Sequence, residues 1–162
     1  MPKCTDEVVK FGRVGRRVVE AAFDGGDIVS DGGVLLLQRV DERLGLIRAA
    51  AHAFGDERRG ASVQHSVHSL LAQRIYGLCL GWSDVCDHNV LRNDLVMQTA
   101  VGRAEPLASA PTLSRLETGA TPAHAAALHE VLMQQFLASH SKAPKELVLD
   151  VDATHVPLHG EQ

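Results

Sequence analysis

Two aspartates near the end of the sequence are spaced for metal chemistry. Asp150 and Asp152 lie in the segment Leu147–Asp152, where apolar residues alternate with other side chains as they do in a β-strand. Residues two positions apart on a strand point to one face, so both carboxylates would share it and repel each other unless a cation lies between them. Mg²⁺ prefers such oxygen ligands, so the pair indicates a site for phosphoryl transfer. On the residues alone, a strand end that faces solvent remains the alternative.

Histidines supply further candidate sites, each with a structural alternative. His155 and His159 have the spacing of zinc ligands on a helix, but Pro157 lies between them, so loop histidines are the preferred interpretation. His65 and His68 are expected on the polar face of a helix, with a contact to a DNA phosphate as the alternative.

Three arginines are candidates for contacts that position DNA, because a guanidinium group binds phosphate oxygens in pairs. A salt bridge between helices explains each of them equally well, with Glu117 or Asp94 as the partner. Both possibilities stay open for these residues, which are Arg74, Arg92 and Arg115.

The elements that must position these residues are mostly helical. The spacing of apolar residues predicts helices over 33–48, 63–80, 84–92, 94–101 and 112–117, and from 122 to a break at 141–144. Residues 1–17 are expected to form a flexible basic arm. A small hairpin should follow, with strands over 18–23 and 28–29 and a turn between them.

Capping residues indicate where several helices begin. Ser30-Asp31 and Ser62 are N-cap candidates for the first two helices. Thr121 followed by Pro122 marks the clearest start, because proline has no amide hydrogen to lose at the first helical position. One apolar face of that last helix is expected to contain Leu128, Leu132 and Phe136, flanked by Ala125 and Val131.

Composition limits the class of protein. The chain has 162 residues with 45% hydrophobic and 4% aromatic content, which fits a globular fold with a core of short aliphatic side chains. A net charge of −4 excludes a surface that is basic throughout, although the first 20 residues are locally basic. Three cysteines without framework spacing, a polar N-terminus and short apolar runs predict a soluble, cytoplasmic protein without a membrane segment.

Short motifs give the chain a family resemblance. Leu149–Thr154 followed by Pro157–Gln162 resembles the first catalytic segment of DDE transposases with an RNase H-like core, above all the bacterial branch named after insertion sequence thirteen-eighty. Further motifs resemble that family in the same order across residues 20–162: Phe23–Gly26, Ser30–Gly33, His65-Ser66, Gln73–Ile75, Gly81–Asp84, Asp87, Leu91–Asp94 and Pro111–Glu117. The resemblance implies that Asp152 is the first catalytic, metal-binding member of the triad, with Asp150 beside it and Mg²⁺ as cofactor. His155-Val156 departs from the acidic residues usual there.

The expected architecture is mainly α-helical with a small N-terminal β-hairpin. Residues 18–143 would form the hairpin and a helical region for DNA binding or dimerisation. Residues 144–162 would begin a truncated RNase H-like α/β domain, because a lone strand cannot satisfy its own backbone groups.

The resemblance implies a transposase that binds terminal inverted repeats and cuts DNA when the remaining triad residues are present. This chain alone is then expected to be catalytically incompetent. One alternative is a non-enzymatic fragment that binds DNA, forms homodimers or associates with an intact transposase. Another is an unrelated helical interaction domain.

Overall fold

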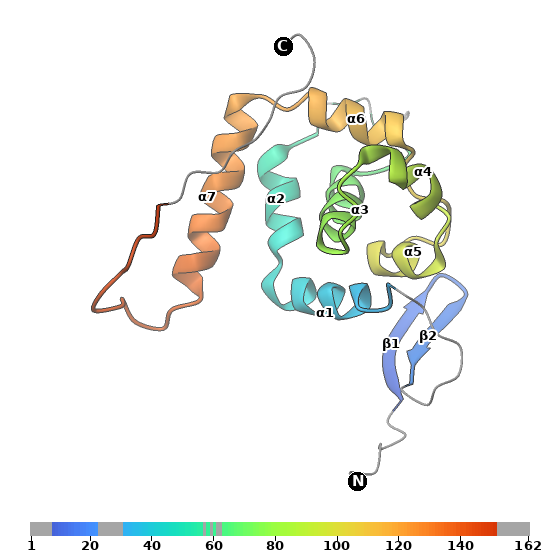
Figure 1. Ribbon diagram of the computed structural model, residues 1–162, viewed down its shortest axis with the longest axis horizontal. Coiled ribbons are helices and arrows are strands. Elements are labelled where there is room, and N and C mark those ends of the chain that lie inside the picture. Colours follow the sequence, from blue (N-terminus) through green and yellow to red (C-terminus); the bar gives the residue numbers. More distant parts are fainter. Residues whose placement is uncertain (1–7, 23–30, 57, 59, 61–62, 152–162) are drawn as a thin grey trace.

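The computed structural model describes residues 8–22, 31–56, 58, 60 and 63–151. In this part of the chain, an antiparallel hairpin is followed by a body of short helices (Figure 1). This confirms the expected mainly helical architecture with a small hairpin. The elements are β1 (Val9–Val14), β2 (Arg17–Ala21), α1 (Val34–Leu44), α2 (Leu46–Phe54), α3 (Val67–Cys79), η2 (Val85–Asp87), α4 (His88–Leu91), α5 (Leu95–Val101), α6 (Ala110–Thr118) and α7 (Pro122–Ala138).

The hairpin lies earlier in the sequence than predicted. β2 occupies much of the predicted strand 18–23, but it pairs with β1, in a register that sets Val9 opposite Ala21 and Val14 opposite Arg17. Residues 9–14 were assigned to the flexible arm, which is wrong, and the predicted partner strand 28–29 lies outside the described residues. The turn is possible because Gly15 adopts a φ of +58°, which glycine tolerates.

The predicted helix over 33–48 is two helices. Gly45 has a φ of +66° and ends α1 by donating its backbone N–H to the Asp41 carbonyl. The Asp41 side chain then accepts a hydrogen bond from the Ile47 backbone N–H at 2.9 Å, which satisfies a free donor at the start of α2. The residue before α1 is Gly33, which offers no capping side chain, and the predicted cap Ser30 is outside the described residues.

Local capping explains where the next helices begin. Ser66 caps α3 by accepting a hydrogen bond from the Ser69 backbone N–H, so this helix begins later than the predicted residue 63. Asp84 caps the short η2–α4 segment by accepting a hydrogen bond from the Cys86 backbone N–H. Asp94 caps α5, which confirms the helix predicted over 94–101. α6 begins at Ala110, before the predicted residue 112, and has Pro111 in its first turn.

α7 begins as predicted but presents a different face to the molecule. Thr121 is the N-cap with Pro122 behind it, and His124 completes a reciprocal capping box. The helix packs along α2 (Figure 1). Leu128 and Val131 are half-buried on that side, whereas Leu132 and Phe136 of the predicted face are 58% and 40% exposed. The predicted face was therefore correct for Leu128 and Val131 and wrong for Leu132 and Phe136, because helical spacing defines an apolar stripe without showing which neighbour covers it.

The main core lies where α1, α2, α3 and α5 meet. Its buried side chains are Val34, Leu35, Ile47, Ala72, Tyr76, Met97, Ala100, Val101 and Leu107. Phe11 and Val19 of the hairpin pack against this core, which explains why a two-stranded sheet forms here. A smaller cluster of Leu70, Ala108 and Leu113 joins α3 to α6.

The predicted strand at residues 147–152 is absent from the described residues, which have no regular structure from Glu146 to Val151. Leu149 and Val151 are 79% and 92% exposed. The alternation of side chains was present, but the described chain offers this segment no strand to pair with. The expected first strand of an RNase H-like sheet is therefore not formed here.

Candidate functional site

The proposed catalytic segment is only partly visible. Asp150 is exposed in an irregular segment, and Asp152 lies outside the described residues, as do His155 and His159. Within the described part of the chain, no group of three His, Cys, Asp or Glu residues is placed to hold a metal ion. A carboxylate at Asp150 has the oxygen chemistry that Mg²⁺ prefers, but a metal site at this segment needs further ligands.

The Arg74 side chain stabilises the fold through an ion pair and backbone hydrogen bonds. Its Nε donates to Glu117 Oε1 at 2.5 Å, and its Nη2 donates to the Ser83 carbonyl at 2.9 Å. Its side chain is only 15% exposed. The ion pair joins α3 to α6, so the structure favours the salt-bridge alternative with Glu117 that the sequence left open for this arginine.

The Arg92 side chain is also used in a hydrogen bond within the fold, to a backbone carbonyl. Its Nε donates to the Leu107 carbonyl at 3.1 Å, and its own carbonyl accepts from the Leu107 N–H and from Gln98 Nε2. The three contacts fasten the loop after α5 onto the end of α4. Asp94 is the N-cap of α5 and forms no ion pair with Arg92 among the described residues.

Arg115 is the candidate that remains free for a ligand. It is exposed on α6, and its one side-chain hydrogen bond among the described residues is to the Thr112 hydroxyl at 3.1 Å. It lines a hollow of about 830 Å³ between α6, the end of α2 and the starts of α3 and α7. The polar and charged residues around it include Asp56, Arg58, Gln64, His65, Thr121 and His124.

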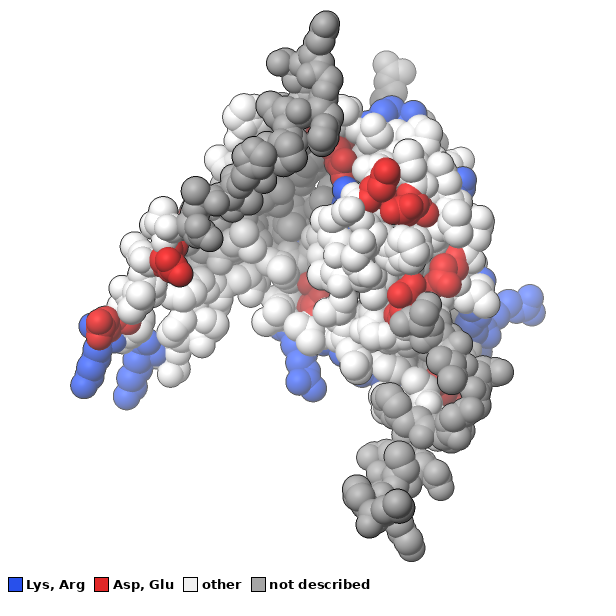
Figure 2. Space-filling model, viewed as in Figure 1, with Lys and Arg blue, Asp and Glu red and all other residues white. Residues whose placement is uncertain are grey.

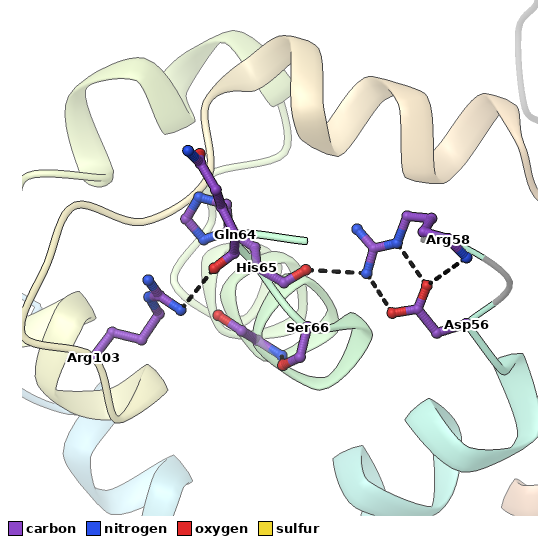
Figure 3. A network of polar contacts seen from close by, with 7 residues as sticks. Asp56, Arg58, Gln64, His65, Ser66 and Arg103 are labelled. Carbon is purple, nitrogen blue, oxygen red and sulfur yellow. Dashed lines mark hydrogen bonds and ion pairs between the residues drawn. The ribbon is translucent and has the colours of Figure 1, made fainter. Parts of the chain in front are cut away.

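Two arginines hold the segment that forms one wall of this hollow (Figure 3). Arg58 forms an ion pair with Asp56 and donates Nη2 to the His65 carbonyl at 3.0 Å. Arg103 donates Nη1 to the Gln64 carbonyl at 3.1 Å from the opposite side. These bonds fix the chain just before Ser66, the cap of α3.

His65 is partly buried near three arginines. Burial lowers the pKa of His65, and the charges of Arg103, Arg92 and Arg58 lower it further. Such a surrounding disfavours a further cation and favours an anion. His65 lies just before α3 and not on it, whereas His68 is an exposed residue of that helix, as predicted.

A buried polar cluster was missed by the sequence analysis. Gln73 exchanges two hydrogen bonds of 2.9 Å with the Ala108 backbone, and its Nε2 lies 3.2 Å from His88 Nδ1. Gln73 and His88 are fully buried, and burial lowers the pKa of His88. Because Gln73 Nε2 is a donor, His88 Nδ1 accepts and the ring is neutral. Gln73 lies in one of the family-like motifs, but nothing in the sequence pairs it with His88.

No helix of the described residues is long and apolar enough to cross a membrane. Comparison with curated proteins and with solved structures found no match. Residues 11–162 match a family model described as "Transposase DDE domain group 1". This match spans the hairpin, the helical body and the aspartate segment, and the chain therefore belongs to the DDE transposase family.

Proposed function

We propose that this chain is the N-terminal region of an insertion-sequence transposase of the thirteen-eighty branch, which binds DNA at terminal inverted repeats in the bacterial cytoplasm. The observation that carries the proposal is the family match over residues 11–162, which includes the segment Leu149–Thr154. In this proposal the helical body binds DNA, and the aspartate segment belongs to an RNase H-like catalytic domain.

Asp152 would be the first metal-binding aspartate of the catalytic triad, with Asp150 as a second oxygen ligand. These two carboxylates would hold the Mg²⁺, whose chemistry would be to polarise a phosphoryl oxygen and to stabilise negative charge on the oxygens at the phosphorus. The protein's own contribution is to hold the two carboxylates together and to orient the DNA strand. The family resemblance implies two further triad residues besides Asp152, so we propose that the 162-residue chain does not cleave DNA by itself.

The hollow beside Arg115 is the part of the helical body best suited to hold a DNA phosphate. Arg115 is exposed, and Thr112 orients its guanidinium group. The start of α7 lies on the same hollow, and a helix N-terminus carries a partial positive charge. This arrangement supports sequence-independent contacts that position DNA.

Two assays with the 162-residue chain test the proposal. Fluorescence anisotropy with labelled repeat-end duplex DNA should show binding that weakens steeply as the salt concentration rises, since phosphate contacts release counterions. Absence of binding at low salt would contradict the DNA-binding role. Incubation of the same DNA with Mg²⁺ should give no strand cleavage, and robust cleavage that Asp152→Ala abolishes would refute the claim of incompetence.

A second candidate function is self-association or association with an intact transposase. The outer side of α7 carries four exposed large apolar residues, which are Leu132, Met133, Phe136 and Leu137. Glu130 is the one charged residue of the whole helix. Exposed apolar faces of this kind favour contact with another protein surface.

A further inference from the structure

The β1–β2 hairpin is fastened to the helical body by arginine side chains. Arg17 donates Nη1 to Gln98 Oε1 at 2.8 Å and Nη2 to the Ala104 carbonyl at 3.0 Å, which holds the turn end against α5. Arg39 of α1 lies over the Phe11 ring, 5.2 Å from its centre, and donates to the Lys10 carbonyl. A two-stranded sheet on its own is marginally stable, so these contacts keep the hairpin in one orientation.

The opposite side of the hairpin carries basic residues that face solvent. Phe11, Arg17 and Val19 are half-buried toward the body, whereas Arg13 and Arg16 are exposed. Neither of these two arginines forms an ion pair or a side-chain hydrogen bond with another described residue. Lysine and arginine side chains project from the molecule where Figure 1 places the hairpin turn (Figure 2).

The acidic residues do not neutralise this surface. Glu20 is the acidic residue within the two strands, and its carboxylate lies 3.8 Å from Lys10 Nζ, with both side chains largely exposed. Arg13 and Arg16 therefore add charge beyond the Lys10–Glu20 pair. The chain as a whole has a net charge of −4, so the positive charge of the hairpin is opposite in sign to that of the whole chain.

The hairpin turn also lies close to the loop that contacts the wall of the Arg115 hollow. An added Cβ at Gly15 would lie 3.2 Å from the Ala104 Cβ, so the turn touches the loop after α5. The residue before Ala104 is Arg103, which contacts Gln64 at the wall of the Arg115 hollow. The loop after α5 therefore contacts both the hairpin turn and a residue that lines the hollow.

We propose that the solvent-facing side of the β1–β2 hairpin binds the phosphate backbone of duplex DNA through Arg13 and Arg16. This inference rests on the proposed DNA-binding function and identifies a site for it outside the helices. A two-stranded β-ribbon fits the major groove of B-form DNA, whose walls are lined by phosphates. Guanidinium groups bind phosphate oxygens in a bidentate manner. Because Arg17 and Arg39 already hold the hairpin in place, little backbone entropy would be lost when Arg13 and Arg16 bind DNA.

The test measures the affinity of the 162-residue chain for a labelled 30-base-pair duplex by anisotropy across a series of salt concentrations. Arg13→Ala combined with Arg16→Ala should weaken binding by about tenfold or more at low salt. The slope of log K against log salt should become shallower by about 2, because two phosphate contacts are lost. The paired change Arg13→Lys and Arg16→Lys should retain most of the slope, because the charges remain.

The matched control is Lys142→Ala combined with Lys145→Ala, which removes the same charge from exposed residues after α7. This control should bind with the wild-type slope. Circular dichroism melting curves verify that each variant is folded. If the alanine pair is not folded, the single changes Arg13→Ala and Arg16→Ala test the site, and each should make the slope shallower by about 1. An unchanged affinity and slope for the alanine pair, or an equal loss for the control pair, would overturn the hairpin site and leave the proposed function intact. No binding by the unaltered chain would overturn both.

Discussion

At the scale of single residues, position in the fold decides what an arginine does. Arg74 is 15% exposed and joins α3 to α6 through Glu117 and the Ser83 carbonyl. Arg115 is exposed and lines the hollow on the other side of α6. Both arginines belong to motifs that resemble the family. Membership of a motif therefore does not show whether an arginine stabilises the fold or is available to bind a ligand.

The first prediction separates these two roles. Arg74→Ala should lower the free energy of unfolding by about 1–3 kcal/mol, because Glu117 and two carbonyls lose a charged donor. Its DNA affinity should stay near that of wild type. Arg115→Ala should change stability by less than about 0.5 kcal/mol and reduce DNA affinity. Urea denaturation and salt-dependent anisotropy check both, and the reverse pattern would contradict the assignment.

Tyr76 offers a second prediction, since it is the single tyrosine of the chain. Burial, together with the smaller effect of the nearby charges of Asp41 and Glu42, raises the pKa of Tyr76 to about 12. The folded state therefore holds the phenol proton that the unfolded chain releases near pH 10. Stability should be unaffected below pH 10 and should fall as the pH rises from 10 towards 12.

Absorbance at about 295 nm should follow this ionisation, which for an ordinary tyrosine occurs near pH 10. In the folded protein the midpoint is expected near 12 unless the chain unfolds first. The control is the same titration in concentrated guanidinium chloride, where the midpoint should return to about 10. A midpoint near 10 in the folded protein would show that Tyr76 is not buried as described.

At the scale of elements, the close approach of α3 and α4 depends on a glycine. A Cβ added at Gly77 would lie 2.7 Å from His88 Cε1, and His88 is fully buried against Gln73. The ring has no room to move, because Gln73 in turn holds the Ala108 backbone. The glycine is therefore required by packing and not by its backbone conformation.

The third prediction follows from this contact. Gly77→Ala should destabilise the protein by about 1–3 kcal/mol through overpacking. In an open helix the same change would stabilise by about 1 kcal/mol, so the expected sign is reversed. Gly33→Ala is the control, since a Cβ at Gly33 meets nothing within 4 Å, and it should change stability by less than about 1 kcal/mol. Equal effects of the two substitutions would contradict the packing argument.

At the scale of the whole molecule, α7 is the least integrated helix. It packs against α2, none of its residues is fully buried, and Gln135 donates to the Leu44 carbonyl at the end of α1. Its outer side is apolar, with Leu132 and Leu137 58% and 57% exposed. This side is the surface that the second candidate function assigns to self-association.

The fourth prediction tests that assignment. Sedimentation velocity of the 162-residue chain should show a concentration-dependent shift towards a dimer. Leu132→Asp combined with Leu137→Asp should abolish the shift, because charges on an apolar contact are costly to desolvate. Gln134→Asp is the control on an exposed polar residue of the same helix and should leave association unchanged. If the unaltered chain remains monomeric at all concentrations, the proposed self-association through α7 is contradicted.

The sequence alone was sufficient for helix starts whose capping residue could be recognised, although the cap of α3 is Ser66 and not the predicted Ser62. Asp94 and Thr121 each cap a helix by accepting from a backbone N–H three residues later, so the starts of α5 and α7 were predictable. The family resemblance of the aspartate segment likewise depends on adjacent residues, and the match over 11–162 confirms membership of the DDE transposases. The roles of Asp150, Asp152 and Mg²⁺ stay predictions.

Only the tertiary structure decided the contacts between distant parts of the chain. Arg17 is 81 positions from Gln98, and Arg74 is 43 positions from Glu117, so spacing along the sequence could not pair them. The hairpin was misplaced although its two strands are neighbours in the sequence. The limit set by distant contacts does explain why residues 147–151 form no strand. Alternating side chains make a strand possible, but a partner must satisfy its backbone, and that partner is set by long-range packing.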